Sequence, residues 1–203
     1  VMRNRIFMDR TIKTGPISGE RALEYGFTGP NLRAAGVDYD VRVMTPYSSY
    51  EDFEFIIPIG TAGDTYDRFC VREEEMWQSL SIIRQALDKM PKTNEFFADV
   101  PEFYLPPKDA VYNTMEGLIW HFKIVMGEVD VPKGQVYHCV EGGNGELGFY
   151  LVSDGGRQPF RLHFRRPCFI YYQAYPGMIK GALLSDAIIT MSSMNVIAGE
   201  LDA

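Results

Sequence analysis

The pattern of apolar and polar positions along the chain predicts two helices in its first half. Ser18 is a good N-cap and Gly26 a good C-cap for a short helix between them. A long helix is expected to begin near residues 64–67, where an apolar stripe with helical spacing starts. This stripe consists of Phe69, Met76, Leu80, Ile83 and Leu87.

Two more helices are predicted in the second half. After a Pro-rich connector over residues 90–108, a second long helix should run from about Asp109 to Met126, and a last helix from Ser185 to about Met194. Four apolar side chains of the second long helix are expected to face inward: Met115, Leu118, Ile119 and Phe122.

Three segments have the composition of β-strands, at residues 135–140, 147–153 and 160–165. The second is nearly all apolar and is expected to be buried on both faces. A short strand-like run at residues 53–59 precedes the long helix, whereas residues 28–50, rich in Gly, Pro and Tyr, are predicted to be an ordered loop. The fold class is therefore α+β: long helices, a small antiparallel β unit and a C-terminal helix.

Composition narrows the possible functions. The chain has 203 residues, 46% of them hydrophobic, which is enough for a substantial core. A net charge of -7 argues against general nucleic-acid binding, which requires a basic surface. No stretch of eighteen apolar residues is present, so no membrane span is predicted.

The residues that could ligate metals or attack substrates are scattered. No CxxC pair and no ligand spacing connects them, so the sequence assigns no metal site and no catalytic residue. The residues concerned are Cys70, Cys139, Cys168, His121, His138 and His163. Cys168 is expected to be a buried structural thiol. The Gly-rich segment 141–146 is flanked by acids, which repel phosphate, so it is predicted to be a turn.

Among the polar side chains, the carboxylates are the best candidates for a chemical role, namely proton transfer. Glu141 and Glu146 flank the Gly-rich turn, Glu116 lies on the second long helix, and Glu200 and Asp202 lie in the tail. A buried carboxylate has a raised pKa and can relay protons, whereas an exposed one only increases solubility. Carboxylates are mostly exposed in proteins, so exposure is the expectation for each, with Glu141 and Glu146 as the possible proton relay.

Seven segments, in order along the chain, resemble motifs of one family: the D subunit of NADH-quinone oxidoreductase (respiratory complex I), which is the mitochondrial 49 kDa subunit family. They are LRAAG at 32–36, YDVR at 39–42, PY at 46–47, GDTYDR at 63–68, MEGLIWHFK at 115–123, GELGFYLVSDG at 145–155 and NVIAGELD at 195–202. The resemblance covers essentially the whole chain. It implies that residues 1–203 are one structural unit, the C-terminal half of a subunit whose N-terminal half is missing.

The family shares ancestry with the large subunit of nickel–iron hydrogenases, so the resemblance implies a hydrogenase-like fold. The two C-terminal cysteines that hold the hydrogenase metal fall on Ile197 and Glu200, and isoleucine cannot ligate a metal. The resemblance therefore implies an apolar and acidic wall that faces a quinone headgroup, formed by Met194, Ile197 and Glu200.

The implied function belongs to an assembly. Together with the B subunit of complex I the chain would form the quinone-binding chamber, where electrons pass from a 4Fe-4S cluster in that neighbour to quinone, coupled to proton translocation. NADH and FMN would bind elsewhere in the complex, and this chain would bind no cofactor and be inactive alone. The implied partners are the B and C subunits and the membrane-arm subunits, at the cytoplasmic face of the bacterial inner membrane or the matrix side of the mitochondrial one. The alternatives are a hydrogenase-like subunit of a related membrane-bound complex and an inactive scaffold fragment.

Three positions depart from the family motifs. Asn144 stands where the family has Arg or Lys, Asn195 where it has Asp, and Ala203 where it has Arg. A salt bridge made by the missing cation would be lost, and charge relay through the tail is correspondingly less expected.

Overall fold

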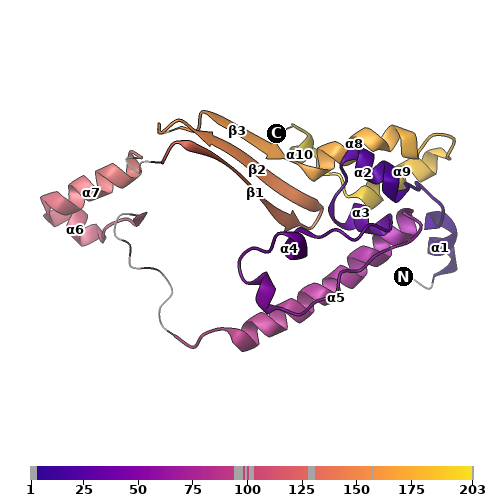
Figure 1. Ribbon diagram of the computed structural model, residues 1–203, viewed down its shortest axis with the longest axis horizontal. Helices are drawn as coiled ribbons and strands as arrows, with labels where there is room; N and C mark the ends of the chain where they lie inside the picture. The colour runs from indigo at the N-terminus through magenta and orange to yellow at the C-terminus, as the bar shows by residue number, and fades with distance from the viewer. Residues whose placement is uncertain are drawn as a thin grey trace. The chain divides into compact units, whose positions relative to one another are not determined.

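The computed structural model describes residues 4–93, 98, 100, 103–127, 131–156 and 158–202 (Figure 1). The chain forms two compact units. Unit 1 comprises Val1–Met90, His138–Gly148 and Phe164–Ala203, and unit 2 comprises Pro91–Tyr137 and Phe149–His163. The expectation that residues 1–203 form one structural unit of a longer subunit stays a prediction.

The described residues form helices and one small sheet, so the α+β class is confirmed. The helices of unit 1 are α1 (Arg5–Thr11), α2 (Gly19–Tyr25), α3 (Gly29–Ala34), α4 (Val41–Met44), α5 (Thr65–Lys89), α8 (Pro167–Met178), α9 (Leu184–Met194) and α10 (Ala198–Asp202), with the 3-10 turn η1 (Tyr50–Asp52). Unit 2 contains α6 (Lys108–Asn113) and α7 (Met115–Val125). The antiparallel sheet has the order β1 (Gly134–Gly142), β2 (Gly145–Ser153), β3 (Arg161–Arg165), and the Gly-rich segment is the β1–β2 turn.

The helices with clear capping residues follow the sequence. The Ser18 side chain accepts a hydrogen bond from Arg21 N at the start of α2, and Gly26 ends this helix with a φ of 81°. At the start of α5 the Asp64 carboxylate accepts from Asp67 N, as its position before the apolar stripe predicts. The predicted last helix is α9.

Short elements held by tertiary contacts were missed. The predicted loop 28–50 contains α3 and α4, and the Asp40 side chain caps α4. The predicted strand 53–59 is wrong: its backbone is extended but is bound by two side chains of α5, Gln85 at Glu54 and Gln78 at Ile56 N. Helices α1, α8 and α10 also had no counterpart in the sequence prediction. Helices α1 and α10 have only seven and five residues, which gives little periodicity to detect, and α8 contains Pro176, a residue that argues against a helix.

The predicted second long helix is broken into α6 and α7. Thr114 causes the break, because its hydroxyl donates to Ala110 O and accepts from Gly117 N, so it ends one helix and caps the next. The expectation that Met115 and Phe122 face inward is also wrong, as is that for Leu118 and Ile119, because these side chains are 48–67% exposed. Part of the predicted connector 90–108 lies outside the described residues.

The core of unit 1 lies between α2, α3, α8 and α9, and these helices lie side by side in Figure 1. It consists of Ile17, Ala22, Phe27, Leu32, Tyr171, Ala174, Met178 and Met194. Phe27 and Tyr171 meet edge to face with ring centroids 4.7 Å apart. No helix in the described part of the chain is long and apolar enough to cross a membrane.

Candidate functional site: a buried charge cluster and the tail pocket

A buried arginine lies at the centre of a group of five charged side chains in unit 1. Arg33 on α3 is 1% exposed, and its guanidinium lies 2.6 Å from Glu75 on α5 and 3.0 Å from Glu141 on β1. It also lies 3.4 Å from Asp40, which Arg42 binds through both carboxylate oxygens at 2.9 and 2.6 Å. We call these five residues the charge cluster; it contains one more carboxylate than guanidinium.

Burial and pairing set the titration of the charge cluster. Burial raises the pKa of Glu141 above its ordinary value, and the attraction of Arg33 offsets this rise only in part. Burial would also raise the pKa of Asp40, but hydrogen bonds from Arg42 and the charge of Arg33 hold it below its ordinary value. The expectation that Glu141 is exposed is therefore wrong, because the fold brings the distant Arg33 to it.

Glu146, at the start of β2, is buried as well, so its expected exposure is wrong too. Its carboxylate accepts from the Tyr39 hydroxyl at 3.0 Å and lies 3.8 Å from Arg165. Burial, followed by the hydrogen bond to Glu146, raises the pKa of Tyr39 to about 12. Tyr39 thus binds Glu146 directly and reaches Glu141 only through Arg33, which donates to the Tyr39 carbonyl at 3.0 Å and to Glu141 at 3.0 Å.

The tail begins where α9 ends, at Asn195 in a left-handed conformation with a φ of 55°. Glu200 on α10 accepts a hydrogen bond from Cys168 N at 3.0 Å, so a carboxylate caps the positive end of α8. Ile197 is 47% exposed. Met194 is fully buried in the core, so its side chain supports the tail from inside unit 1.

Two of the three residues that depart from the family motifs contact each other. Asn195 donates through Nδ2 to Asn144 Oδ1 at 2.5 Å, which joins the tail to the β1–β2 turn. The Asn144 carbonyl accepts from the buried Tyr171 hydroxyl at 2.6 Å. Where the family resemblance has a cation and a carboxylate, this chain therefore has a neutral amide pair, whose strength does not depend on the titration of either residue. The third departure, Ala203, lies outside the described residues.

The β1–β2 turn and the tail line an open hollow of about 250 Å³, which we call the tail pocket. It is lined by Arg72, Gly142, Gly143, Asn144, Gly145, Leu147, Pro167, Asn195 and Glu200. Of the three predicted wall residues, Glu200 lines it, whereas Met194 and Ile197 do not. Sequence reasoning missed Arg72 and did not place Asn144 beside the tail, because both residues are far from the tail along the chain.

The cysteines and histidines take part in no three-residue metal site in the described part of the chain. No three side chains of His, Cys, Asp or Glu there could hold a metal ion together. Cys168 is fully buried, which confirms the expected structural thiol, and burial followed by the neighbouring Glu200 raises its pKa to about 11.

Comparison with known proteins places the chain in a family. A family model described as "Respiratory-chain NADH dehydrogenase, 49 Kd subunit" matches residues 1–203, and the chain belongs to this family. The chain is 75% identical over 201 residues to the NADH-quinone oxidoreductase D subunit of Flavobacterium johnsoniae, with 99% of this chain and 49% of the relative covered. It is 58% identical over 202 residues to the D subunit of Leptospira biflexa, with 100% and 50% covered. With the D subunit of Myxococcus xanthus the identity is 52% over 199 residues, with 98% and 48% covered. The chain spans about half the length of these relatives.

Proposed function

We propose that the chain acts as part of a proton-translocating NADH-quinone oxidoreductase, where its tail forms one wall of the quinone-binding chamber. A neighbouring B subunit would hold the 4Fe-4S cluster that passes electrons to the quinone. The C subunit and the membrane-arm subunits would be further partners. The chain itself would belong to the peripheral arm, at the cytoplasmic face of the bacterial inner membrane or the matrix side of the mitochondrial one. NADH and FMN would bind elsewhere in the complex.

The meeting of the tail with the β1–β2 turn carries this proposal. Glu200 and Asn195 line one hollow with the turn, and the exposed Ile197 lies three residues before Glu200. An exposed apolar side chain in the same short tail as a fixed carboxylate and an amide suits a flat carbonyl-bearing ring, which needs apolar contact on its face and polar groups at its edge. Met194 would act as a buried support for this wall.

We assign the proton-handling role to Glu141 and Glu146. The charge cluster contains one more carboxylate than guanidinium, and Glu141 has a raised pKa. The ionised cluster therefore has an excess negative charge that one proton neutralises. Tyr39 connects the cluster to Glu146 through its carbonyl and its hydroxyl.

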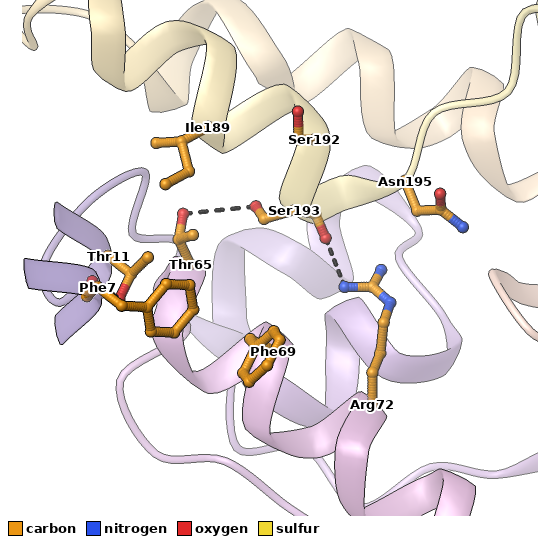
Figure 2. A pocket seen from close by; sticks show the side chains of 9 residues that line it. All are labelled: Phe7, Thr11, Thr65, Phe69, Arg72, Ile189, Ser192, Ser193 and Asn195. Carbon is orange, nitrogen blue, oxygen red and sulfur yellow. Dashed lines mark hydrogen bonds between the residues drawn. The ribbon is translucent and has the colours of Figure 1, made fainter. Parts of the chain in front are cut away.

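The quinone assignment is tested in the assembled complex with the variant Ile197→Met. The longer, flexible side chain should change the KM for quinone and the sensitivity to quinone-site inhibitors, while NADH oxidation by ferricyanide, which bypasses the quinone, stays unchanged. Ile188→Met on the exposed face of α9 is the matched control, since Ile188 is 68% exposed and lines neither the tail pocket nor the pocket of Figure 2. Unchanged quinone kinetics in Ile197→Met would show that the tail does not form a wall of the chamber.

The relay is tested separately with Glu141→Gln in the same complex. The amide keeps the shape of the side chain and one acceptor but cannot exchange a proton. We expect fewer protons translocated per NADH oxidised, or a shifted pH profile of quinone reduction. A wild-type ratio and an unchanged profile would exclude Glu141 from the proton path.

A further inference from the structure

Three side chains that are far apart in the sequence close a circuit of hydrogen bonds beside the tail. Asn195 donates through Nδ2 to Asn144 Oδ1 at 2.5 Å, and Asn144 donates through Nδ2 to Cys168 Sγ at 3.6 Å. The Cys168 thiol in turn donates to Asn195 O at 3.5 Å. Each of the three residues therefore bonds to the other two, and we call this set the tail lock. It joins the β1–β2 turn, the start of α8 and the first residue of the tail.

The tail lock lies mostly inside the protein. Cys168 is fully buried and Asn144 is 8% exposed. The Asn144 carbonyl also accepts from the buried Tyr171 hydroxyl at 2.6 Å, so the backbone and the side chain of the turn are both held. A buried polar atom that loses its partner is costly, and the members of a closed circuit lose partners together. The three residues of the tail lock therefore fix one another's positions.

Cys168 holds the tail at two points. Its thiol binds the carbonyl of Asn195, which has a φ of 55°, a left-handed conformation that asparagine tolerates. Figure 2 shows Asn195 directly after the last turn of α9. Five residues later, Glu200 accepts from Cys168 N at 3.0 Å. Ile197 lies between these two anchors and is 47% exposed, so the anchors limit the directions in which its side chain can point.

The tail lock is uncharged at physiological pH. Amides do not titrate there, and burial, followed by the neighbouring Glu200, raises the pKa of Cys168 to about 11. Burial raises the pKa of the adjacent Tyr171 to about 12, so its hydroxyl also stays neutral. The charged groups that line the tail pocket with the two asparagines are Arg72 and Glu200. Quinone reduction consumes protons, and an uncharged anchor does not compete for them or move when the local pH changes.

We propose that Asn144, Cys168 and Asn195 are positioning residues for the quinone. Their circuit holds the tail so that Ile197 and Glu200 meet the headgroup in one fixed arrangement. This inference rests on the proposed quinone wall and adds the residues, on two other elements, that keep the wall in place. Cys168 does not line the tail pocket, so it acts on the quinone only through the tail.

The thiol is tested by steady-state quinone reduction in the assembled complex. Cys168→Ala opens the circuit and should raise the KM for quinone about fivefold, the size expected for the loss of one buried hydrogen bond, with a smaller change in kcat. Cys168→Ser keeps a donor and an acceptor and should return the KM toward the wild-type value. Cys70→Ala, which changes a half-buried cysteine of α5 outside the tail lock, is the matched control and should leave the KM unchanged. An unchanged KM in Cys168→Ala, or equal KM values in the Ala and Ser variants, would overturn the inference.

A double-mutant cycle tests whether the residues act as a unit. Asn144→Leu should also raise the quinone KM, and its combination with Cys168→Ala should raise it no further than the larger single effect, because either change already opens the circuit. Single effects that multiply in the double variant would show that the two side chains act separately and would contradict the proposal. If Asn144→Leu prevents assembly, Asn144→Asp takes its place in the cycle, since it keeps the acceptor for Asn195 but loses the donor to Cys168.

Ile197→Met separates a failure of this inference from a failure of the quinone wall. A changed quinone KM in Ile197→Met, together with wild-type KM values in Cys168→Ala and Asn144→Leu, would leave the wall standing and reject the tail lock as its support. Unchanged quinone kinetics in Ile197→Met would instead reject the wall, and the inference with it.

Discussion

Removal of the central cation from the charge cluster is the sharpest stability test that this chain offers. In Arg33→Met the apolar side chain retains most of the volume, but Glu75 and Glu141 lose a partner at 2.6 and 3.0 Å. Asp40 keeps Arg42. Because the Arg33 side chain is 1% exposed, water cannot take over its role. Breaking a buried ion pair by removing one partner costs about 3–5 kcal/mol, and we expect a loss of that size.

The assay is urea unfolding followed by far-UV circular dichroism. The slope of the unfolding free energy against urea concentration should be the same in the variant and the wild type, which checks two-state behaviour. Arg5→Met is the matched control, since Arg5 pairs with Asp9 on the exposed surface of α1 and its loss should not be measurable. A loss in Arg33→Met below about 1 kcal/mol would refute the view that these charges are buried together.

The same cluster predicts a pH dependence. The folded pKa of Glu141 is above its ordinary value of 4.5, so the folded protein binds that proton more strongly than the unfolded chain. Its contribution to stability is complete below pH 4.5 and is lost as the pH rises through the raised pKa. Asp40 has the opposite sign: its pKa is below 3.8, so its contribution exists above pH 3.8 and is lost as the pH falls through the lowered pKa. In Glu141→Gln, the increase in unfolding free energy as the pH falls toward 4.5 should be smaller than in the wild type. An unchanged dependence of the unfolding free energy on pH would mean that another group causes the increase.

Three further predictions concern single side chains. Tyr171→Phe removes the donor shared by two buried carbonyls and should cost about 1–3 kcal/mol in urea unfolding; a smaller loss would mean that water replaces the hydroxyl. Gly29→Ala should destabilise far more than Gly127→Ala, because both glycines have positive φ but only the new methyl at Gly29 would collide with the Gly145 backbone; equal losses would mean that strain alone matters. The half-buried Cys70 should react with a thiol reagent at pH 8 before the fully buried Cys168, and the opposite order would show that unit 1 opens locally around α8.

Capping residues and the order of the motifs were sufficient to predict several helix bounds, the fold class and the family of this protein. Ser18, Gly26 and Asp64 act on atoms within a few residues of themselves, so the bounds of α2 and the start of α5 follow from the sequence. The α+β class and the β1–β2 turn have the same local origin. The family also follows from sequence, because seven motifs in one order are specific even where each alone is weak.

Tertiary structure decided which polar groups are buried and which apolar ones are open. Sequence statistics place carboxylates outside, yet Glu141 lies inside because Arg33, 108 positions away, meets it there. The stripe of α5 has the periodicity of a buried face, but periodicity gives the direction of a face and not the identity of what covers it. The pairing of Asn144 with Asn195 is likewise a contact between distant segments, as are the hydrogen bonds from Arg72 to Ser193 O and Asn31 Oδ1. Burial and pairing depend on long-range contacts, and these are the features on which the proposed quinone wall and the proposed relay rest.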